Sequence, residues 1–207
     1  MAEQIHLQFP SARTRGGARP GAGRPKGSRR SERMPHTPRP AVSRHKPHHV
    51  TVKFARGTWN LRSQRCFAPI RAALRVLTER KGFRVVHFSV QHNHLHLVTE
   101  ATDRRAMSNG MRALLIRIAR GVNAVMGVRG RRVGDRYHEH ILRTPTEVKN
   151  ALRYVLGNRT RHLEQWGKAH LAGGTDPFSS LTRAVDALVL PPGSWLLREG
   201  WTRAGPI

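Results

Sequence analysis

The sequence has a single cysteine, few acidic residues and no long apolar run, and each of these shortages excludes a class of protein. One cysteine, Cys66, rules out an internal disulfide and any zinc site built from several cysteines, and it fits a reducing compartment. No run of apolar residues is long enough for a membrane-spanning helix, and the segment after Met1 lacks the pattern of a signal peptide. We therefore expect a cytoplasmic protein without a membrane partner.

Acidic residues are the scarcest of the charged types. Only 12 Asp and Glu stand against 38 Lys and Arg, which gives a formal net charge of +26 and a pI near 12.0. Such an excess repels itself, and it is usually tolerated because the partner is a polyanion. Nucleic acid is the first expectation, and a membrane surface is the alternative.

Composition divides the chain into three parts. Residues 1–46 are rich in Arg, Gly and Pro and are predicted to form a disordered basic arm. Residues 47–162 carry enough apolar residues to build a core. Residues 163–207 form a C-terminal extension with weaker patterns, for which DNA binding is one interpretation. In the arm, residues 23–27 resemble the core of an AT-hook, with Arg24 and Lys26 as DNA contacts; a general phosphate-binding tail is the alternative.

Apolar periodicity in the middle part predicts four strands and three helices. Strands are expected at 49–54, 83–91, 94–100 and 137–143, and helices at 63–81, 104–126 and from 145 to about 158. In the second strand, Val86, Phe88 and Val90 are expected on one face. The order β-α-β-β-α-β followed by a final helix predicts an α+β, ferredoxin-like fold with an antiparallel sheet.

Two histidines in the third strand form the first candidate site. In His94-Leu95-His96 the imidazoles lie two residues apart and therefore project from the same face of a strand. Such a pair can chelate one divalent ion. Two polar residues on a solvated sheet face are the alternative interpretation.

A tyrosine on the last helix is the second candidate. Tyr154 and Asn158 are four residues apart and share one helical face, and Asn150 extends it. The apolar Val148 and Leu152 lie on another side. A packed face beside a separate polar stripe indicates that the stripe lines a site, although a lone helical tyrosine is more often a packing residue.

These two motifs carry a family resemblance. Residues 90–98, Val-Gln-His-Asn-His-Leu-His-Leu-Val, resemble the histidine motif of HUH endonucleases, in the form found in single-tyrosine transposases and most closely in the REP-associated tyrosine transposases. Residues 153–158, Arg-Tyr-Val-Leu-Gly-Asn, resemble their catalytic helix. The likeness covers about 48–162. It departs at Gly157-Asn158-Arg159, where many relatives have Asn-Pro, and in both terminal arms.

The resemblance implies an HUH fold and a metal-dependent single-strand DNA nickase and transposase. His94, His96 and Asn158 would hold Mg²⁺ or Mn²⁺, and Tyr154 would attack a phosphate to give a 5′-phosphotyrosine link. The implied partner is single-stranded or hairpin DNA such as a REP hairpin, and relatives occur as monomers and as homodimers.

Several alternatives stay open. Tyr137 competes as nucleophile, and His92 could assist from the face of His94. His138, Glu139 and His140 form a second polar cluster, for which a second metal site and a solvated strand are the two interpretations. A hairpin-binding protein without catalysis, or an unrelated RNA- or DNA-binding sheet of the RRM type, competes as the function. DNA contacts are expected from two groups of arginines, one on the long helix and one in the basic turn after it: Arg112, Arg117 and Arg120, and Arg129, Arg131 and Arg132.

Overall fold

The computed structural model describes residues 38–165, 167, 174–182 and 188–207. The expected AT-hook with Arg24 and Lys26, and most of the expected arm, lie outside the described residues. Among the described residues, no helix is long and apolar enough to cross a membrane.

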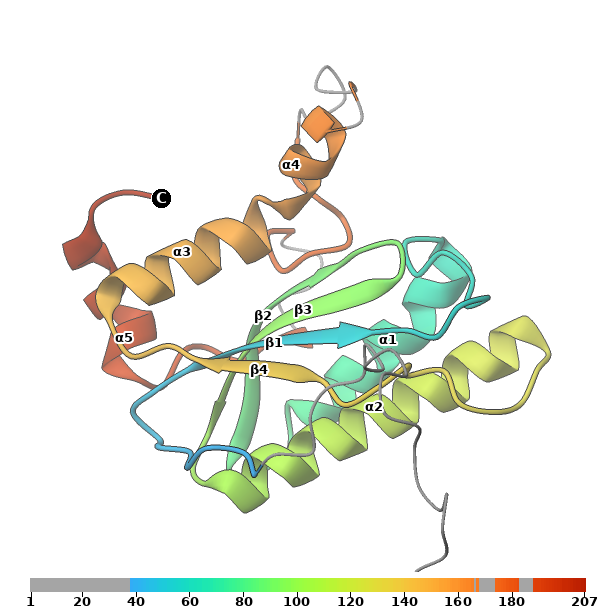
Figure 1. Ribbon diagram of the computed structural model, residues 1–207, viewed down its shortest axis with the longest axis horizontal. Coiled ribbons are helices and arrows are strands. Elements are labelled where there is room, and N and C mark those ends of the chain that lie inside the picture. The colour runs from blue at the N-terminus through green and yellow to red at the C-terminus, as the bar shows by residue number, and fades with distance from the viewer. Residues whose placement is uncertain (1–37, 166, 168–173, 183–187) are drawn as a thin grey trace, which may run out of the picture. The chain divides into compact units, whose positions relative to one another are not determined.

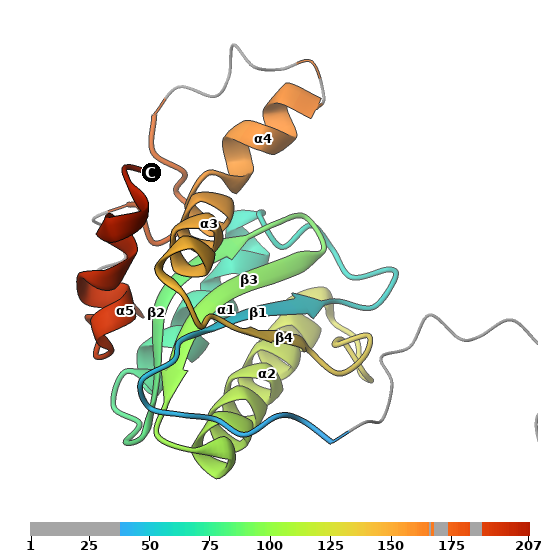
Figure 2. The same cartoon turned by 60° about the vertical axis from the view of Figure 1, so that its left-hand side comes forward.

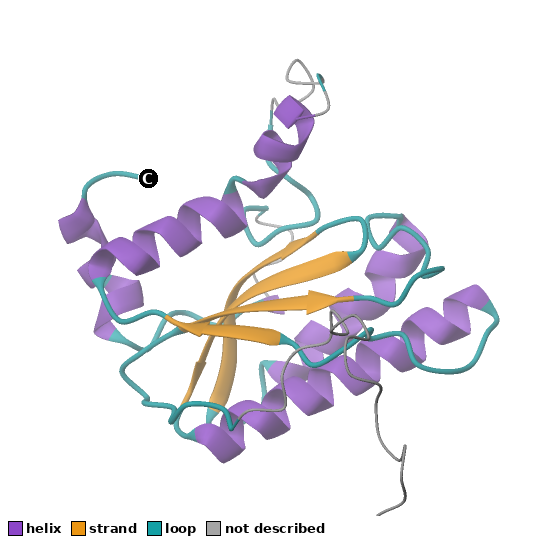
Figure 3. Cartoon of the chain, viewed as in Figure 1, coloured by secondary structure: helices purple, strands orange, loops and turns teal. Residues whose placement is uncertain are grey.

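A four-stranded sheet forms the centre of the described chain. Its strands are β1 (His48–Lys53), β2 (Phe83–Val90), β3 (His94–Ala101) and β4 (His138–Ile141). They lie in the order β2-β3-β1-β4, and every neighbouring pair is antiparallel. The predicted α+β, ferredoxin-like fold is confirmed (Figure 3).

Helices cover both faces of this sheet. α1 (Gln64–Leu77) and α2 (Arg104–Met126) lie on one face, and α3 (Pro145–Leu156) lies on the other (Figure 1). The larger core lies between α1, α2 and the sheet, and a smaller core lies under α3. Successive side chains of a strand point to opposite faces of the sheet, so β3 contributes to both cores. Leu95 and Leu97 pack in the larger core, and Val98 packs in the smaller one.

One predicted strand face is wrong because β2 contains a bulge. The register with β3 shifts between Val85 and His87. An extra residue in one strand reverses the faces that follow it. Val86 therefore packs in the smaller core under α3, while Phe88 and Val90 pack in the larger core.

Capping residues fix the ends of the helices. Asp103 caps α2 through the N–H of Ala106, and Gly127 ends that helix in the left-handed region at φ 66°. Thr144 and Glu147 form a capping box at the start of α3, with Pro145 in its first turn. The predicted bounds of α2 are confirmed, whereas α1 ends at Leu77, four residues before the predicted end.

The last predicted helix is divided. α3 ends at Leu156, and α4 (Asn158–Gln165) begins after Gly157 and runs away from the sheet (Figure 2). The N–H of Gly157 still donates to the carbonyl of Arg153 at 2.9 Å. A β-carbon on Gly157 would lie 2.8 Å from that carbonyl oxygen, so the tight junction requires glycine.

Parts of the C-terminal extension return to the sheet. The N–H of Val90 donates to Phe178 O at 2.8 Å, and that of Ser180 donates to Phe88 O at 3.0 Å, so this segment covers the outer edge of β2. α5 (Trp195–Arg198) and the 3₁₀ turn η3 (Gly200–Ala204) follow. Trp201 packs against the core under α3.

Candidate active site

The two histidines of the motif lie on the sheet face that α3 covers. In β3, Leu95 and Leu97 enter the core on the opposite face, so alternation turns His94 and His96 toward α3. The two rings are 4.7 Å apart between centroids, at 86° to each other. His96 is 3% exposed, whereas His94, beside the β2–β3 turn, is partly exposed.

Tyr154 reaches this pair from α3. Its ring centroid lies 5.0 Å from that of His96, with the rings at 86°. Val148, Leu152 and Val155 pack in the core under the helix and thereby set its rotation. The imidazole pair and the phenol, about sixty residues apart in sequence, therefore meet on one side of the sheet, as the resemblance of the two motifs predicted.

Two side chains of β1 complete the surroundings of His96. Thr51 Oγ1 lies 3.1 Å from His96 Nδ1, and His49 Nε2 lies 3.3 Å from the same nitrogen. Burial and the neighbouring His138 and His140 lower the pKa of His49 to about 4, so its ring is neutral at pH 7. The sequence analysis missed both residues. Alternation in β1 places them on one face, but only the register with β3 brings them to His96.

Asn158, the third predicted metal ligand, is 1% exposed at the start of α4. Neither its Oδ1 nor its Nδ2 has a hydrogen-bond partner among the described residues. A buried amide without partners costs free energy, so its oxygen is suited to a ligand that the protein alone does not supply. Together with the two imidazoles, this amide fits a divalent cation whose remaining positions a phosphate would fill.

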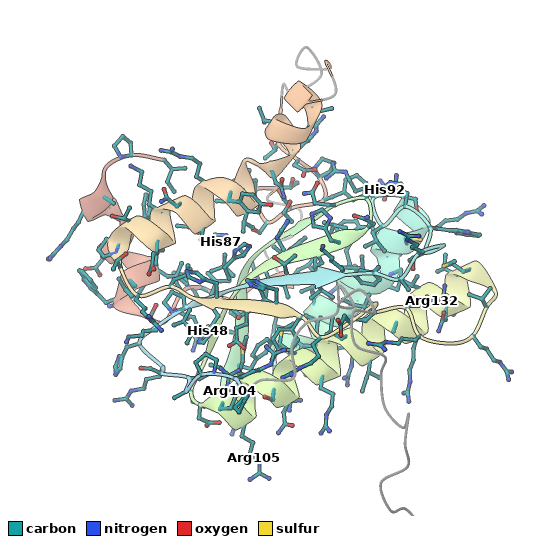
Figure 4. All side chains as sticks on the ribbon, in the orientation of Figure 1. His48, His87, His92, Arg104, Arg105 and Arg132 are labelled. Carbon is teal, nitrogen blue, oxygen red and sulfur yellow. The ribbon has the colours of Figure 1, made fainter. Side chains whose placement is uncertain are left out.

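No group of three or more His, Cys, Asp or Glu side chains placed to hold a metal exists within the part of the chain that the structure describes. The predicted set contains two histidines and one amide. His92 is exposed in the β2–β3 turn (Figure 4). Glu139, between His138 and His140, is instead the centre of an ion-pair cluster, in which Arg39 and Arg104 each approach it at 2.8 Å.

Tyr137, the alternative nucleophile, lies on the wrong side of the sheet. It packs against the larger core, on the face of α1 and α2. The guanidinium of Arg39 lies 3.6 Å from its ring centroid, and burial raises the pKa of its hydroxyl. Tyr137 is therefore a packing residue.

A cavity of about 330 Å³ opens beside Tyr154, between α3 and the edge formed by β1 and β4. Leu142 and Ala151 supply apolar surface, and the remaining lining side chains are polar or aromatic: His49, His140, Glu147, Asn150 and Tyr154. Two residues of the predicted polar stripe, Asn150 and Tyr154, thus line a cavity, whereas the third, Asn158, lies on α4 and does not.

The predicted DNA-binding arginines do not lie at this cavity. Arg112, Arg117 and Arg120 are exposed on α2, which covers the other sheet face. Arg129 and Arg131 are exposed in the turn after α2, and Arg132, placed there in Figure 4, is partly buried. A second cavity of about 330 Å³ between α2 and Tyr137 is lined by three arginines that sequence reasoning had not grouped: Arg39, Arg112 and Arg136.

Comparison with known proteins gives a likeness in structure only. No protein-family model matches the chain, and no curated protein matches it in sequence. A REP-associated tyrosine transposase bound to a REP hairpin has a similar structure, with a TM-score of 0.55 and 17% identity over 77% of this chain and 93% of that one. A protein of Deinococcus radiodurans R1 assigned as a transposase is similar at a TM-score of 0.40 and 15% identity, over 58% of this chain and 90% of that one. The chain therefore has the fold of the REP-associated tyrosine transposase, as its motifs predicted.

Proposed function

We propose that this chain is a REP-associated tyrosine transposase, a metal-dependent enzyme that cuts and rejoins single-stranded DNA at or near hairpin-forming repeats. The observation that carries the proposal is the edge-on contact of Tyr154 with His96, at 5.0 Å between ring centroids, beside His94. The side chain proposed as nucleophile and the two imidazoles proposed to hold the metal thereby lie in one site. The shared fold supports the same assignment.

His94, His96 and Asn158 would hold Mg²⁺ or Mn²⁺. When bound, this ion neutralises charge on the scissile phosphate and on the departing oxygen. Because Thr51 and His49 contact Nδ1 of His96, Nε2 is the ring nitrogen that would bind the ion. The buried amide of Asn158 supplies the oxygen that a hard cation prefers.

Tyr154 performs the covalent step. Its hydroxyl oxygen loses a proton and attacks phosphorus, and the bond between phosphorus and the 3′-oxygen of the preceding nucleotide breaks. The 3′-oxygen takes up a proton and leaves as a free hydroxyl, while the 5′-phosphate stays on Tyr154. The phosphodiester bond is replaced by a phosphotyrosyl ester of similar energy, so a 3′-hydroxyl can reverse the reaction and join strands without ATP.

The DNA substrate is proposed from charge and from the structural neighbour. A net charge of +26 favours a polyanion. The similar transposase is bound to a hairpin, and we extend hairpin binding to this chain. The contact of His96 with Tyr154 within one chain supports a monomeric site, and a homodimer that exchanges α3 through the segment before Pro145 is the other arrangement.

A covalent-adduct assay tests the proposal. The protein is mixed with single-stranded hairpin DNA and Mn²⁺ or Mg²⁺ and analysed on a denaturing protein gel. We expect an adduct with the wild type and none with Tyr154→Phe, while Tyr137→Phe, the matched control on the opposite sheet face, retains it. Hairpin binding without an adduct in the wild type would instead show a binding protein without catalysis.

A further inference from the structure

The cavity beside Tyr154 differs in charge from the rest of the protein. The chain has 38 Lys and Arg, yet none of the lysines and arginines in its described residues lines this cavity. Its one ionisable acid is Glu147, whose pKa is lowered by hydrogen bonds from the backbone N–H groups of Arg143 and Thr144. Glu147 is therefore negatively charged at neutral pH. A cavity with a carboxylate and no lining Lys or Arg disfavours a phosphate group.

The arginine-lined cavity on the other side of β4 provides the contrast. Its walls carry Arg39, Arg112 and Arg136 together with the hydroxyl-bearing Ser108 and Tyr137. That set suits phosphate oxygens. Two cavities of equal volume thus have opposite chemistry, and the one that includes the nucleophile is the one unsuited to the DNA backbone.

The lining does suit a nucleobase. Single-stranded nucleic acid is recognised through unstacked bases that lie against aromatic rings and present their edges to hydrogen-bonding groups. His49 and Tyr154 supply rings whose centroids are 5.7 Å apart. The exposed amide of Asn150 can donate and accept. A volume near 330 Å³ lies at the lower end of the range of small-ligand sites, about 300–1,000 Å³, and suits a single planar base.

The carboxylate indicates which base edges are favoured. Glu147 Oε2 accepts the backbone N–H groups at the start of α3, whereas Oε1 is turned toward His140, 3.8 Å from its Nε2. An ionised carboxylate only accepts hydrogen bonds. It therefore favours bases with an exocyclic amino group facing it, such as cytosine or adenine, over thymine.

We propose that this cavity binds one unpaired base next to the scissile phosphate and selects a base that carries an amino group. The inference rests on the proposed function, because Tyr154 belongs both to the candidate active site and to the wall of the cavity. A nucleotide adjoining the phosphate that Tyr154 attacks is therefore within reach of Asn150 and Glu147. The cavity selects the base at the cut, while the hairpin is bound elsewhere.

Sequencing of covalent adducts tests this inference. The probe is a DNA hairpin with randomised single-stranded flanks, incubated with protein and Mn²⁺, and both the attached and the released strands are sequenced. In the wild type we expect cytosine or adenine to be enriched over thymine, roughly tenfold, at one position within two nucleotides of the cut. Two variants alter the cavity: Asn150→Ala removes the amide, and Glu147→Gln replaces the carboxylate by a side chain that still completes a capping box.

We expect either variant to flatten or change the preference at that one position. Asn109→Ala, the same substitution on α2 on the opposite sheet face, should leave the preference as in the wild type. Adducts without any preference, or a preference that both variants retain, would overturn the inference while leaving the proposed function intact. If Asn150→Ala gives no adduct, the base preference of the Glu147→Gln adducts alone tests the inference. Absence of adducts with the wild type would instead overturn the proposed function, and the base site with it.

Discussion

Thr51 on β1 and His96 on β3 are directly paired across the sheet, and the hydroxyl of Thr51 lies 3.1 Å from Nδ1 of His96. The contact has a consequence for the proposed metal binding, because an imidazole held at Nδ1 can coordinate an ion only through Nε2. Thr51 thereby fixes the orientation of the ring. Such outer contacts typically change metal affinity or activity by about 10- to 100-fold.

Thr51→Val tests this orienting role. Valine has nearly the shape of threonine but cannot hydrogen-bond, so the fold should persist while His96 is held less well. We expect the Mn²⁺ concentration for half-maximal adduct formation to rise by about tenfold or more. Thr146→Val, at an exposed position in the first turn of α3, serves as the control. An unchanged Mn²⁺ requirement in Thr51→Val would show that Thr51 does not orient the ligand.

The junction at Gly157 provides a second prediction. A β-carbon there would lie 2.8 Å from the carbonyl oxygen of Arg153, so Gly157→Ala must move the start of α4 and Asn158 with it. Displacement of a site residue by about 1 Å can reduce the rate about 100-fold. We expect adduct formation to fall by that order, with little change in circular dichroism. Gly167→Ala is the control: it places a β-carbon in open space at a residue with a left-handed backbone, so it strains the backbone without a clash. Equal losses of adduct formation in both variants would contradict the explanation.

Acid should destabilise the protein through His87, which lies between α3 and the sheet (Figure 4). Burial lowers the pKa of His87 to about 4 from 6.5. The folded state then binds fewer protons than the unfolded state between these values, so stability is present above pH 6.5 and is lost as the pH falls toward 4. Between pH 7 and 5 the loss is about 2 kcal/mol for this one group. Burial raises the pKa of Glu139, but hydrogen bonds from His48, Arg104 and Arg39 outweigh it and lower the pKa to about 2. The stabilisation that Glu139 provides is therefore lost only as the pH falls below 4.5.

Denaturant unfolding at several pH values measures this loss. His87→Gln cannot be protonated and should show a shallower fall in unfolding free energy between pH 7 and 5 than the wild type. His92→Gln, at the exposed β2–β3 turn, should follow the wild type. Parallel curves for His87→Gln and the wild type would refute the assignment.

The sequence predicted those features that depend on neighbours in the chain. Alternation placed His94 and His96 on one face, and four-residue spacing placed Tyr154 beside Asn150 on α3. It did not predict features that depend on pairing between distant segments. His49 and Thr51 reach His96 only through the β1–β3 register, and the bulge that turns Val86 to the other face has no marker such as glycine in residues 83–90. The grouping of Arg39, Arg112 and Arg136 likewise requires the packing of three segments.

The arginine-lined cavity leads to the last prediction, which concerns DNA affinity. Arg39 is already paired with Glu139 at 2.8 Å, so Arg112, which is exposed on α2, is the arginine of this cavity chosen for the test. Each phosphate contact on a single strand contributes about −0.7 to the slope of log affinity against log salt. We expect Arg112→Ala to weaken hairpin binding and to make this slope shallower by about 0.7 if it contacts one phosphate. Arg105→Ala removes an equal charge at the start of α2, where the side chain points away from the domain in Figure 4, and should leave the slope as it is. Equal slopes for both variants would mean that net charge, not this cavity, determines binding.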